Sequence, residues 1–238
     1  MKQIYALITL LFTATFVVSP ALTDPFMGFT DSQLPFPQID PPIQPAGYAF
    51  AIWGLIYGWL IVSAVFGIVK RGDSPSWDHA RAPLIASLAI GTPWLWIANQ
   101  SAIWATISIV AMAVFAIWAL LRAPLFDRWW LQAPVGIYAG WLTAASFVSL
   151  GSTAAGYGIV FGSLGWAFVG IISALAVTLT VLSRKPQAPE YGFVVIWALV
   201  GIIAANTTAV ISVSALAAVG IVIVAGATVK WWRPATVS

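Results

Sequence analysis

The sequence predicts an all-α protein, a polytopic bundle that spans a membrane with about eight transmembrane helices. Three observations predict this class. Of the 238 residues, 61% are hydrophobic and only 7% are charged, whereas soluble domains average about 25% charged residues. The mean hydropathy is +0.95. The apolar residues also form long stretches, and a helix needs about 20 such residues to cross the core of a bilayer.

The second, fourth, sixth and eighth predicted spans are each followed by a segment that combines cations with Pro or Gly, which end helices. Only residues 99–101 separate the third span from the fourth, so these two spans should make a tight antiparallel hairpin. The glycine-rich residues 151–165 are predicted to form a flexible loop. The eight predicted spans are residues 3–20, 46–69, 82–100, 102–121, 130–151, 161–183, 190–206 and 208–229.

The Lys and Arg residues predict the orientation of these spans, because cytoplasmic loops of membrane proteins carry an excess of them. If the N-terminus is cytoplasmic, all ten Lys and Arg residues fall on the cytoplasmic side. The opposite loops then carry only Asp24, Asp31 and Asp40 as charged residues. The sequence therefore predicts a multi-pass protein of the bacterial inner (cell) membrane, with both termini in the cytoplasm.

The first span has two interpretations. One cation followed by an apolar run, with the small residues Ser19 and Ala21 beyond it, is typical of a cleavable signal peptide. Cleavage would leave seven spans with the same orientation. The run is long for a signal peptide, and Pro20 lies beside the site of cleavage. These two features favour an uncleaved helix.

The composition excludes several kinds of site. Cysteine is absent and His79 is the single histidine, so disulfides, thiolate chemistry and multi-histidine metal sites are excluded, and no metal site is predicted. The ten cations are too scattered to form the basic patch of a nucleic-acid-binding protein. No ionisable residue lies in the middle of a span, which argues against an ion-coupled transporter and against general acid–base catalysis. The remaining polar groups suit a site for a mostly apolar molecule.

Aromatic residues share one helix face in two of the predicted spans. In the second span, the spacing i, i+3, i+7 relates Phe50, Trp53 and Tyr57. Tyr138, Trp141 and Ala145 show the same spacing in the fifth span, and in the third span Trp94 follows Pro93, which should kink the helix. We interpret these residues as the walls of an aromatic cavity among the three spans. The candidate ligand-binding residues are Tyr48, Phe50, Trp53, Tyr57, Trp94, Tyr138, Trp141 and Thr143.

Two GxxxG motifs lie beside these aromatic residues, at Gly54–Gly58 and Gly136–Gly140. Such motifs let the backbones of two helices approach closely. The sequence leaves open whether the glycines pack within one chain or between the two chains of a homodimer.

Residues 44–58, QPAGYAFAIWGLIYG, resemble the second helix of the tryptophan-rich sensory protein family, also called the translocator protein (TspO/MBR) family. The family pattern there corresponds to Pro45, Phe50, Trp53 and Tyr57. The fifth span, YAGWLTAASFVS, is similar to the last core helix of the family, with matches at Tyr138, Trp141, Thr143, Ala145 and Ser146. In the third span, Gly91 to Trp94 resembles the family's Asn-x-x-Trp. Gly91 and Ser149 stand where the family has asparagines.

The resemblance covers residues 1–151 and implies a five-helix core with an internal cavity. Residues 152–238 would add three transmembrane helices, as in a longer bacterial branch of the family. Family members bind porphyrins, sterols and related lipophilic molecules, and the loop between their first two helices, here residues 21–45, helps to cover the cavity. The resemblance therefore implies a lipophilic ligand, tetrapyrrole or sterol-like, and a sensory, regulatory or transport role.

The charged residues of the chain argue against a porphyrin as the lipophilic ligand. A bound porphyrin would have no histidine ligand to its metal, and the outer loops offer its propionates no cation. A neutral lipophile fits the charges better. Two alternatives stay open, an uncoupled transporter or channel for a small neutral solute, and light-driven or oxidative chemistry on a bound tetrapyrrole. Nothing in the sequence demands an enzyme.

Overall fold

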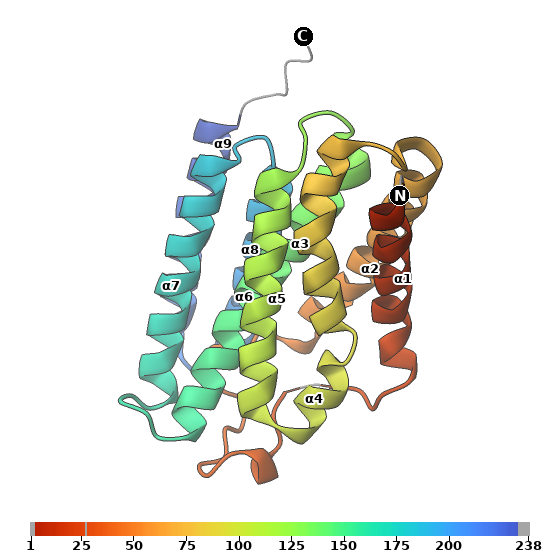
Figure 1. Ribbon diagram of the computed structural model, residues 1–238. Helices are drawn as coiled ribbons and strands as arrows, with labels where there is room; N and C mark the ends of the chain where they lie inside the picture. Colours follow the sequence, from red (N-terminus) through yellow and green to blue (C-terminus); the bar gives the residue numbers. More distant parts are fainter. Residues whose placement is uncertain (1–2, 27, 233–238) are drawn as a thin grey trace.

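The computed structural model describes residues 3–26 and 28–232 and consists there of helices and loops, without strands (Figure 1). Eight helical stretches are long and apolar enough to cross a membrane, which confirms the predicted fold class. The α-helices are α1 (Ile4–Val18), α2 (Ile52–Arg71), α3 (Pro75–Gly91), α4 (Trp94–Gln100), α5 (Ala102–Arg122), α6 (Ala133–Gly156), α7 (Ser163–Arg184), α8 (Pro189–Asn206) and α9 (Ile211–Trp231). Short helical turns are η1 (Ser19–Ala21), η2 (Asp31–Gln33), η3 (Gly47–Ala51) and the π-type turn η4 (Arg128–Gln132).

Helix α6 forms the centre of the bundle, because it packs against α5, α7 and α8 and is buried around almost its whole circumference. Its glycines make these contacts close. A Cβ atom added at Gly140 would lie 2.6 Å from the backbone oxygen of Tyr191 in α8. The second GxxxG motif therefore packs within the chain. By contrast, a Cβ atom at Gly54 or Gly58 would meet nothing within 4 Å.

The predicted flexible loop at residues 151–165 is wrong, because α6 continues to Gly156 and α7 begins at Ser163. The glycines there serve close packing rather than flexibility. A Cβ atom at Gly156 would lie 2.7 Å from the side chain of Leu34, and one at Gly151 would lie 3.1 Å from Ile43. Both contacts join α6 to the segment between α1 and α2.

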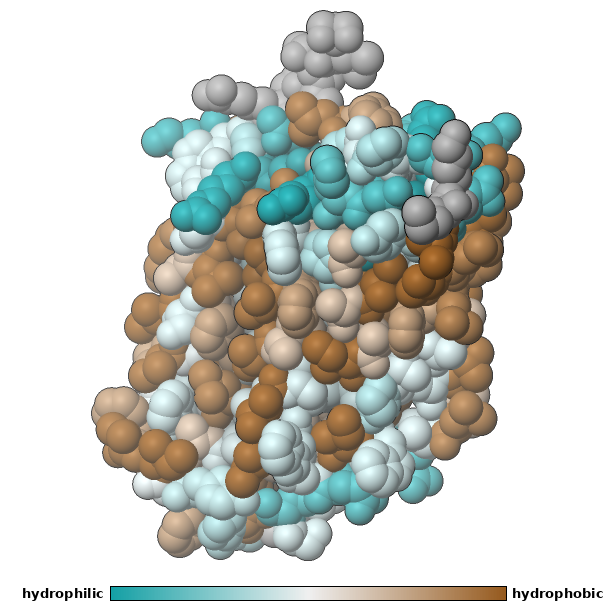
Figure 2. Space-filling model, viewed as in Figure 1, coloured by the Kyte–Doolittle hydropathy of each residue, from teal (hydrophilic) through white to brown (hydrophobic). Residues whose placement is uncertain are grey.

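Hydrophilic residues gather at the two ends of the molecule, and hydrophobic residues cover the middle of the face seen in Figure 2. The end that holds the N-terminus also carries the described cations, which are Lys70, Arg71, Arg81, Arg122, Arg128, Arg184, Lys185 and Lys230. We call it the cationic end; Lys2 and Arg233 lie outside the described residues. His79 is exposed at this end, on α3 rather than in the loop before it.

Three arginines at the cationic end form ion pairs. Arg71 pairs with Asp127 at 2.5 Å, Arg81 pairs with Asp78 at 2.7 Å, and Arg128 pairs with Glu190. The ammonium of Lys185 donates to the backbone oxygen of Ala123, and burial lowers the pKa of this side chain. Trp129 and Trp130 stack on Trp59 and Phe66, as aromatic residues at a membrane interface commonly do.

Replacing Gly140 by Ala tests the α6–α8 contact. We expect Gly140→Ala to destabilise the protein by about 1–3 kcal/mol, because overpacking forces one backbone to move. Thermal unfolding in detergent should show a lower Tm. The matched control is Gly226→Ala on α9, where a Cβ atom meets nothing within 4 Å. Equal Tm values for the two variants would contradict the close contact.

Candidate functional site

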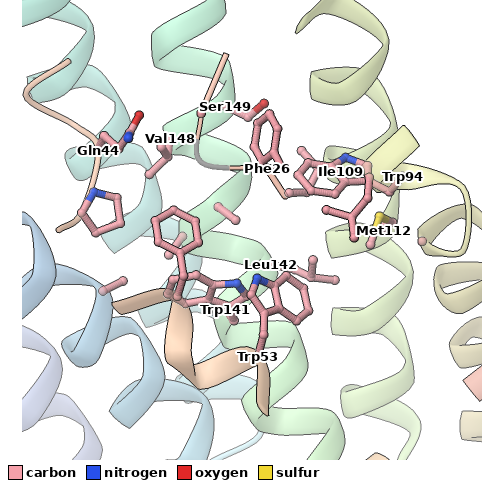
Figure 3. A pocket seen from close by; sticks show the side chains of 18 of the residues that line it. Phe26, Gln44, Trp53, Trp94, Ile109, Met112, Trp141, Leu142, Val148 and Ser149 are labelled. Atoms are coloured by element: carbon pink, nitrogen blue, oxygen red, sulfur yellow. The ribbon is translucent and has the colours of Figure 1, made fainter. Parts of the chain in front are cut away.

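A cavity of about 250 Å³ lies inside the bundle (Figure 3). Its walls come from α1, α2, α5, α6 and α8, from the junction of α3 and α4, and from the segment that joins α1 to α2. The lining residues are mostly apolar and aromatic: Phe16, Pro20, Asp24, Pro25, Phe26, Gly28, Phe29, Gln44, Pro45, Phe50, Trp53, Tyr57, Gly91, Trp94, Leu95, Ile109, Met112, Trp141, Leu142, Ala144, Ala145, Val148, Ser149, Ser152, Ala198 and Ile202.

One wall joins the two aromatic faces that helical spacing identified. Trp53 stacks on Tyr57 with ring centroids 5.3 Å apart. The indole of Trp141 stands nearly perpendicular to Trp53 at 6.2 Å and to Phe50 at 5.8 Å. Edge-to-face contacts of this kind hold aromatic rings in defined positions. These four residues from η3, α2 and α6 line the cavity together.

Trp94 forms part of the opposite wall. The predicted kink is a break, since α3 ends at Gly91 and α4 begins at Trp94 after Pro93. The indole N–H of Trp94 donates to the backbone oxygen of Ala105 at 3.0 Å, and its ring meets Phe26 edge to face at 5.4 Å. Trp94 therefore offers the cavity an apolar surface, because its one donor already has a partner.

Three of the predicted residues lie outside the cavity lining. Tyr48 is exposed and its ring rests against Trp197. The hydroxyl of Tyr138 hydrogen-bonds with Ser87 at 3.0 Å, and the hydroxyl of Thr143 hydrogen-bonds with that of Tyr191 at 2.7 Å. Because neighbours surround α6 on all sides, residues at helical spacing along it face three different helices.

Two buried polar atoms at the cavity have no hydrogen-bond partner among the described residues. They are Nε1 of Trp141 and Oγ of Ser152. Trp141 is only 2% exposed, and Figure 3 shows its indole next to that of Trp53 beside the cavity. An unpaired buried N–H costs about 1–3 kcal/mol. A ligand with an acceptor atom would remove this cost.

The segment between α1 and α2 forms a wall without regular α-helix. Its last part, residues 41–51, runs along α8 and is bonded to it at three points. The side chain of Asn206 donates to Pro42 O at 2.8 Å, the indole of Trp197 donates to Ala49 O at 2.9 Å, and Ala46 N donates to Gly201 O at 3.0 Å. Because Trp197 lies at the middle of α8, this wall reaches the middle of the bundle.

Glycines make room for the same wall. Ile43 is buried between α6 and α7, and a Cβ atom at Gly170 would clash with its side chain. A Cβ atom at Gly201 would lie 2.9 Å from the ring of Pro45. Sequence reasoning placed the cavity among the second, third and fifth spans and missed the parts from α1, α5 and α8. The long-range hydrogen bonds have no local sequence signal, although glycines within apolar spans point to close approaches.

The helices and the cavity together define the class of protein: it is a helical membrane protein with an aromatic cavity inside its bundle. Comparison with known proteins names the family. The sequence pattern of the family described as TSPO-like protein matches residues 3–229, so the chain belongs to that family. The matched region includes the first seven membrane-spanning stretches and the eighth up to residue 229. No curated protein sequence and no solved structure match the chain.

Replacing Asn206 by Ala tests the attachment of residues 41–51 to α8. The change leaves the partly buried oxygen of Pro42 without its side-chain donor, which we expect to cost about 1–3 kcal/mol. Thermal unfolding and limited proteolysis in detergent should show a lower Tm and faster cleavage between α1 and α2. Asn99→Ala is the matched control, because Asn99 donates to Asp24 O in an exposed position where water can replace it. Equal behaviour of both variants would refute the attachment.

Proposed function

We propose that the cavity binds a compact, neutral lipophilic molecule that carries a hydrogen-bond acceptor, and that this binding has a sensory, regulatory or transport role. The observation that carries the proposal is the unpaired N–H of Trp141 in a cavity lined by aromatic rings. A mostly apolar cavity with a few placed polar groups is the usual form of a site for small molecules.

The charges around the cavity support a neutral ligand. Its lining contains no Lys, Arg or His, and Asp24 is its only charged residue. The carboxylates of a porphyrin would therefore lack a cationic partner, and burying an unpaired charge is costly. The single histidine is exposed at the cationic end, so it cannot bind a metal in this cavity.

The size of the cavity supports a compact ligand. Its volume of about 250 Å³ lies just below the range of about 300–1,000 Å³ that is typical for drug-sized ligands. An engineered cavity of about 150 Å³ in another protein binds benzene. A molecule somewhat larger than benzene fits without rearrangement, whereas a tetrapyrrole macrocycle would require the walls to separate.

Transport of a neutral solute through the bundle is a second candidate role. The aromatic packing between the cavity and the cationic end argues against it. The ring of Phe16 lies edge to face with Tyr57 at 5.4 Å and with Tyr138 at 5.7 Å. Beyond these rings, toward the cationic end, lie the buried side chains of Trp77 and Arg81. A cavity closed on this side favours binding over flow. Flux of a bound ligand into reconstituted vesicles would favour transport.

Replacing Trp141 by Phe tests the proposed hydrogen bond. The change keeps an aromatic ring and removes the N–H, so binding of lipophilic ketones should weaken by about 0.5–1.5 kcal/mol, or roughly 2- to 13-fold. Titration of tryptophan fluorescence in detergent measures the affinity. Hydrocarbons of the same shape should bind equally to both proteins, because they accept no hydrogen bond.

The matched control is Trp104→Phe. Trp104 is 64% exposed on α5 and lies outside the cavity lining, so its loss should leave affinity unchanged. The proposal fails if ketones and hydrocarbons bind wild-type protein equally, or if both variants behave alike. Tighter binding of porphyrins than of compact ketones would show that the walls separate and would overturn the size argument.

A further inference from the structure

A second hollow lies on the outer surface of the bundle, between α2 and α8. This groove has a volume of about 420 Å³ and shares no lining residue with the internal cavity. Since the helices cross the membrane, the groove faces the lipid. Its lining is apolar except for one carboxylate: Ala51, Ile52, Leu55, Ile137, Glu190, Phe193, Val194 and Trp197.

Next to the residues of α2 that line the groove, this helix has two glycines, which have no side chain. Gly54 and Gly58 are exposed, and a Cβ atom at either would meet nothing within 4 Å. Leu55 and Gly58 are three residues apart and so lie on the same face of the helix. The open face therefore continues from the groove along α2 toward the cationic end, and no other part of the described chain covers it.

The groove meets an ion pair at the cationic end. Glu190 lies in the first turn of α8, and its side chain is only 9% exposed. One of its oxygens accepts a hydrogen bond from Arg128, whereas Oε2 has no partner among the described residues. Nε of Arg128 and Oε1 of Gln132 are also buried without a partner. This cluster thus has one spare donor and two spare acceptors.

A zwitterionic headgroup with a primary ammonium complements this cluster. An ammonium has three N–H donors and no acceptor, so it can donate to the spare oxygens of Glu190 and Gln132. A phosphate accepts from arginine, so it can take the spare donor of Arg128. A quaternary choline has no N–H to donate, and an anionic glycerol headgroup brings no cation to the carboxylate. The spare atoms therefore distinguish among the common phospholipid headgroups.

We propose that the groove between α2 and α8 binds one phosphatidylethanolamine molecule, with an acyl chain along Leu55, Phe193 and Trp197 and the headgroup at Arg128 and Glu190. The acyl chain lies over the open glycine face of α2. The positive-inside rule assigns the cationic end, and hence this headgroup, to the cytoplasmic leaflet.

Native mass spectrometry of delipidated protein in detergent tests the proposal. Phosphatidylethanolamine, phosphatidylcholine and phosphatidylglycerol with identical chains are titrated separately. We expect the ethanolamine lipid to bind at least tenfold more tightly than the other two. The N-monomethyl and N,N-dimethyl headgroups, which still have an N–H, should bind measurably, and affinity should fall most at the trimethyl stage. Equal affinities for ethanolamine and choline lipids, or tighter binding of the glycerol lipid, would overturn the proposal.

Two variants locate the lipid. Gly58→Leu adds a side chain to the open face, where a Cβ atom meets nothing within 4 Å, and should weaken binding of the ethanolamine lipid at least tenfold, whereas Gly226→Leu, at an equally open glycine of α9, should not change it. Glu190→Gln should remove the preference for ethanolamine over choline. Gly58→Leu should leave ligand titrations of the internal cavity unchanged. The lipid proposal and the proposed function of the cavity are therefore tested independently. Unchanged lipid binding by Gly58→Leu would refute the assigned position.

Discussion

The main constraint on this structure is that backbone polar groups inside a membrane must find partners within the protein. Non-helical backbone is tolerated at membrane depth only where it is buried in protein or lines a cavity. Residues 41–51 meet this condition, because Asn206, Trp197 and the backbone of Gly201 bond to their polar groups. Helix α8 therefore does more than add apolar length. It makes an irregular segment stable in the middle of the bundle.

The cavity follows from that attachment. A continuous helix in place of residues 41–51 would present one narrow face, whereas the irregular segment brings Gln44, Pro45 and Phe50 to the space that Trp141 and Trp94 face from other sides. Two residues of α8, Ala198 and Ile202, complete the lining. Helix α8 is thus part of the architecture that forms the cavity. A family match that runs through it to residue 229 agrees with this dependence.

The sequence predicted what depends on local properties. The eight spans follow from hydropathy, and helical spacing identified Phe50, Trp53 and Trp141, which η3, α2 and α6 turn toward a common space. The same spacing failed for Tyr138, and the family pattern failed for Thr143, because α6 is buried on all sides and has no single inward face. Tyr48 is exposed, and its ring packs against Trp197 of α8 instead. The bonds from α8 join residues about 150 positions apart, beyond any periodic pattern.

The internal cavity and the outer groove differ in a way that separates their ligands. The cavity presents an unpaired neutral donor and no cation, so a phospholipid headgroup would lose its hydration there without gaining an ionic partner. The groove presents spare charged atoms at one end and an open apolar face along its length. Desolvating a charge is costly unless it is paired, so charged headgroups favour the groove and neutral molecules favour the cavity. Under these two proposals, the abundant lipids of the bilayer would not compete for the cavity, even though both sites are apolar and lie within the same membrane.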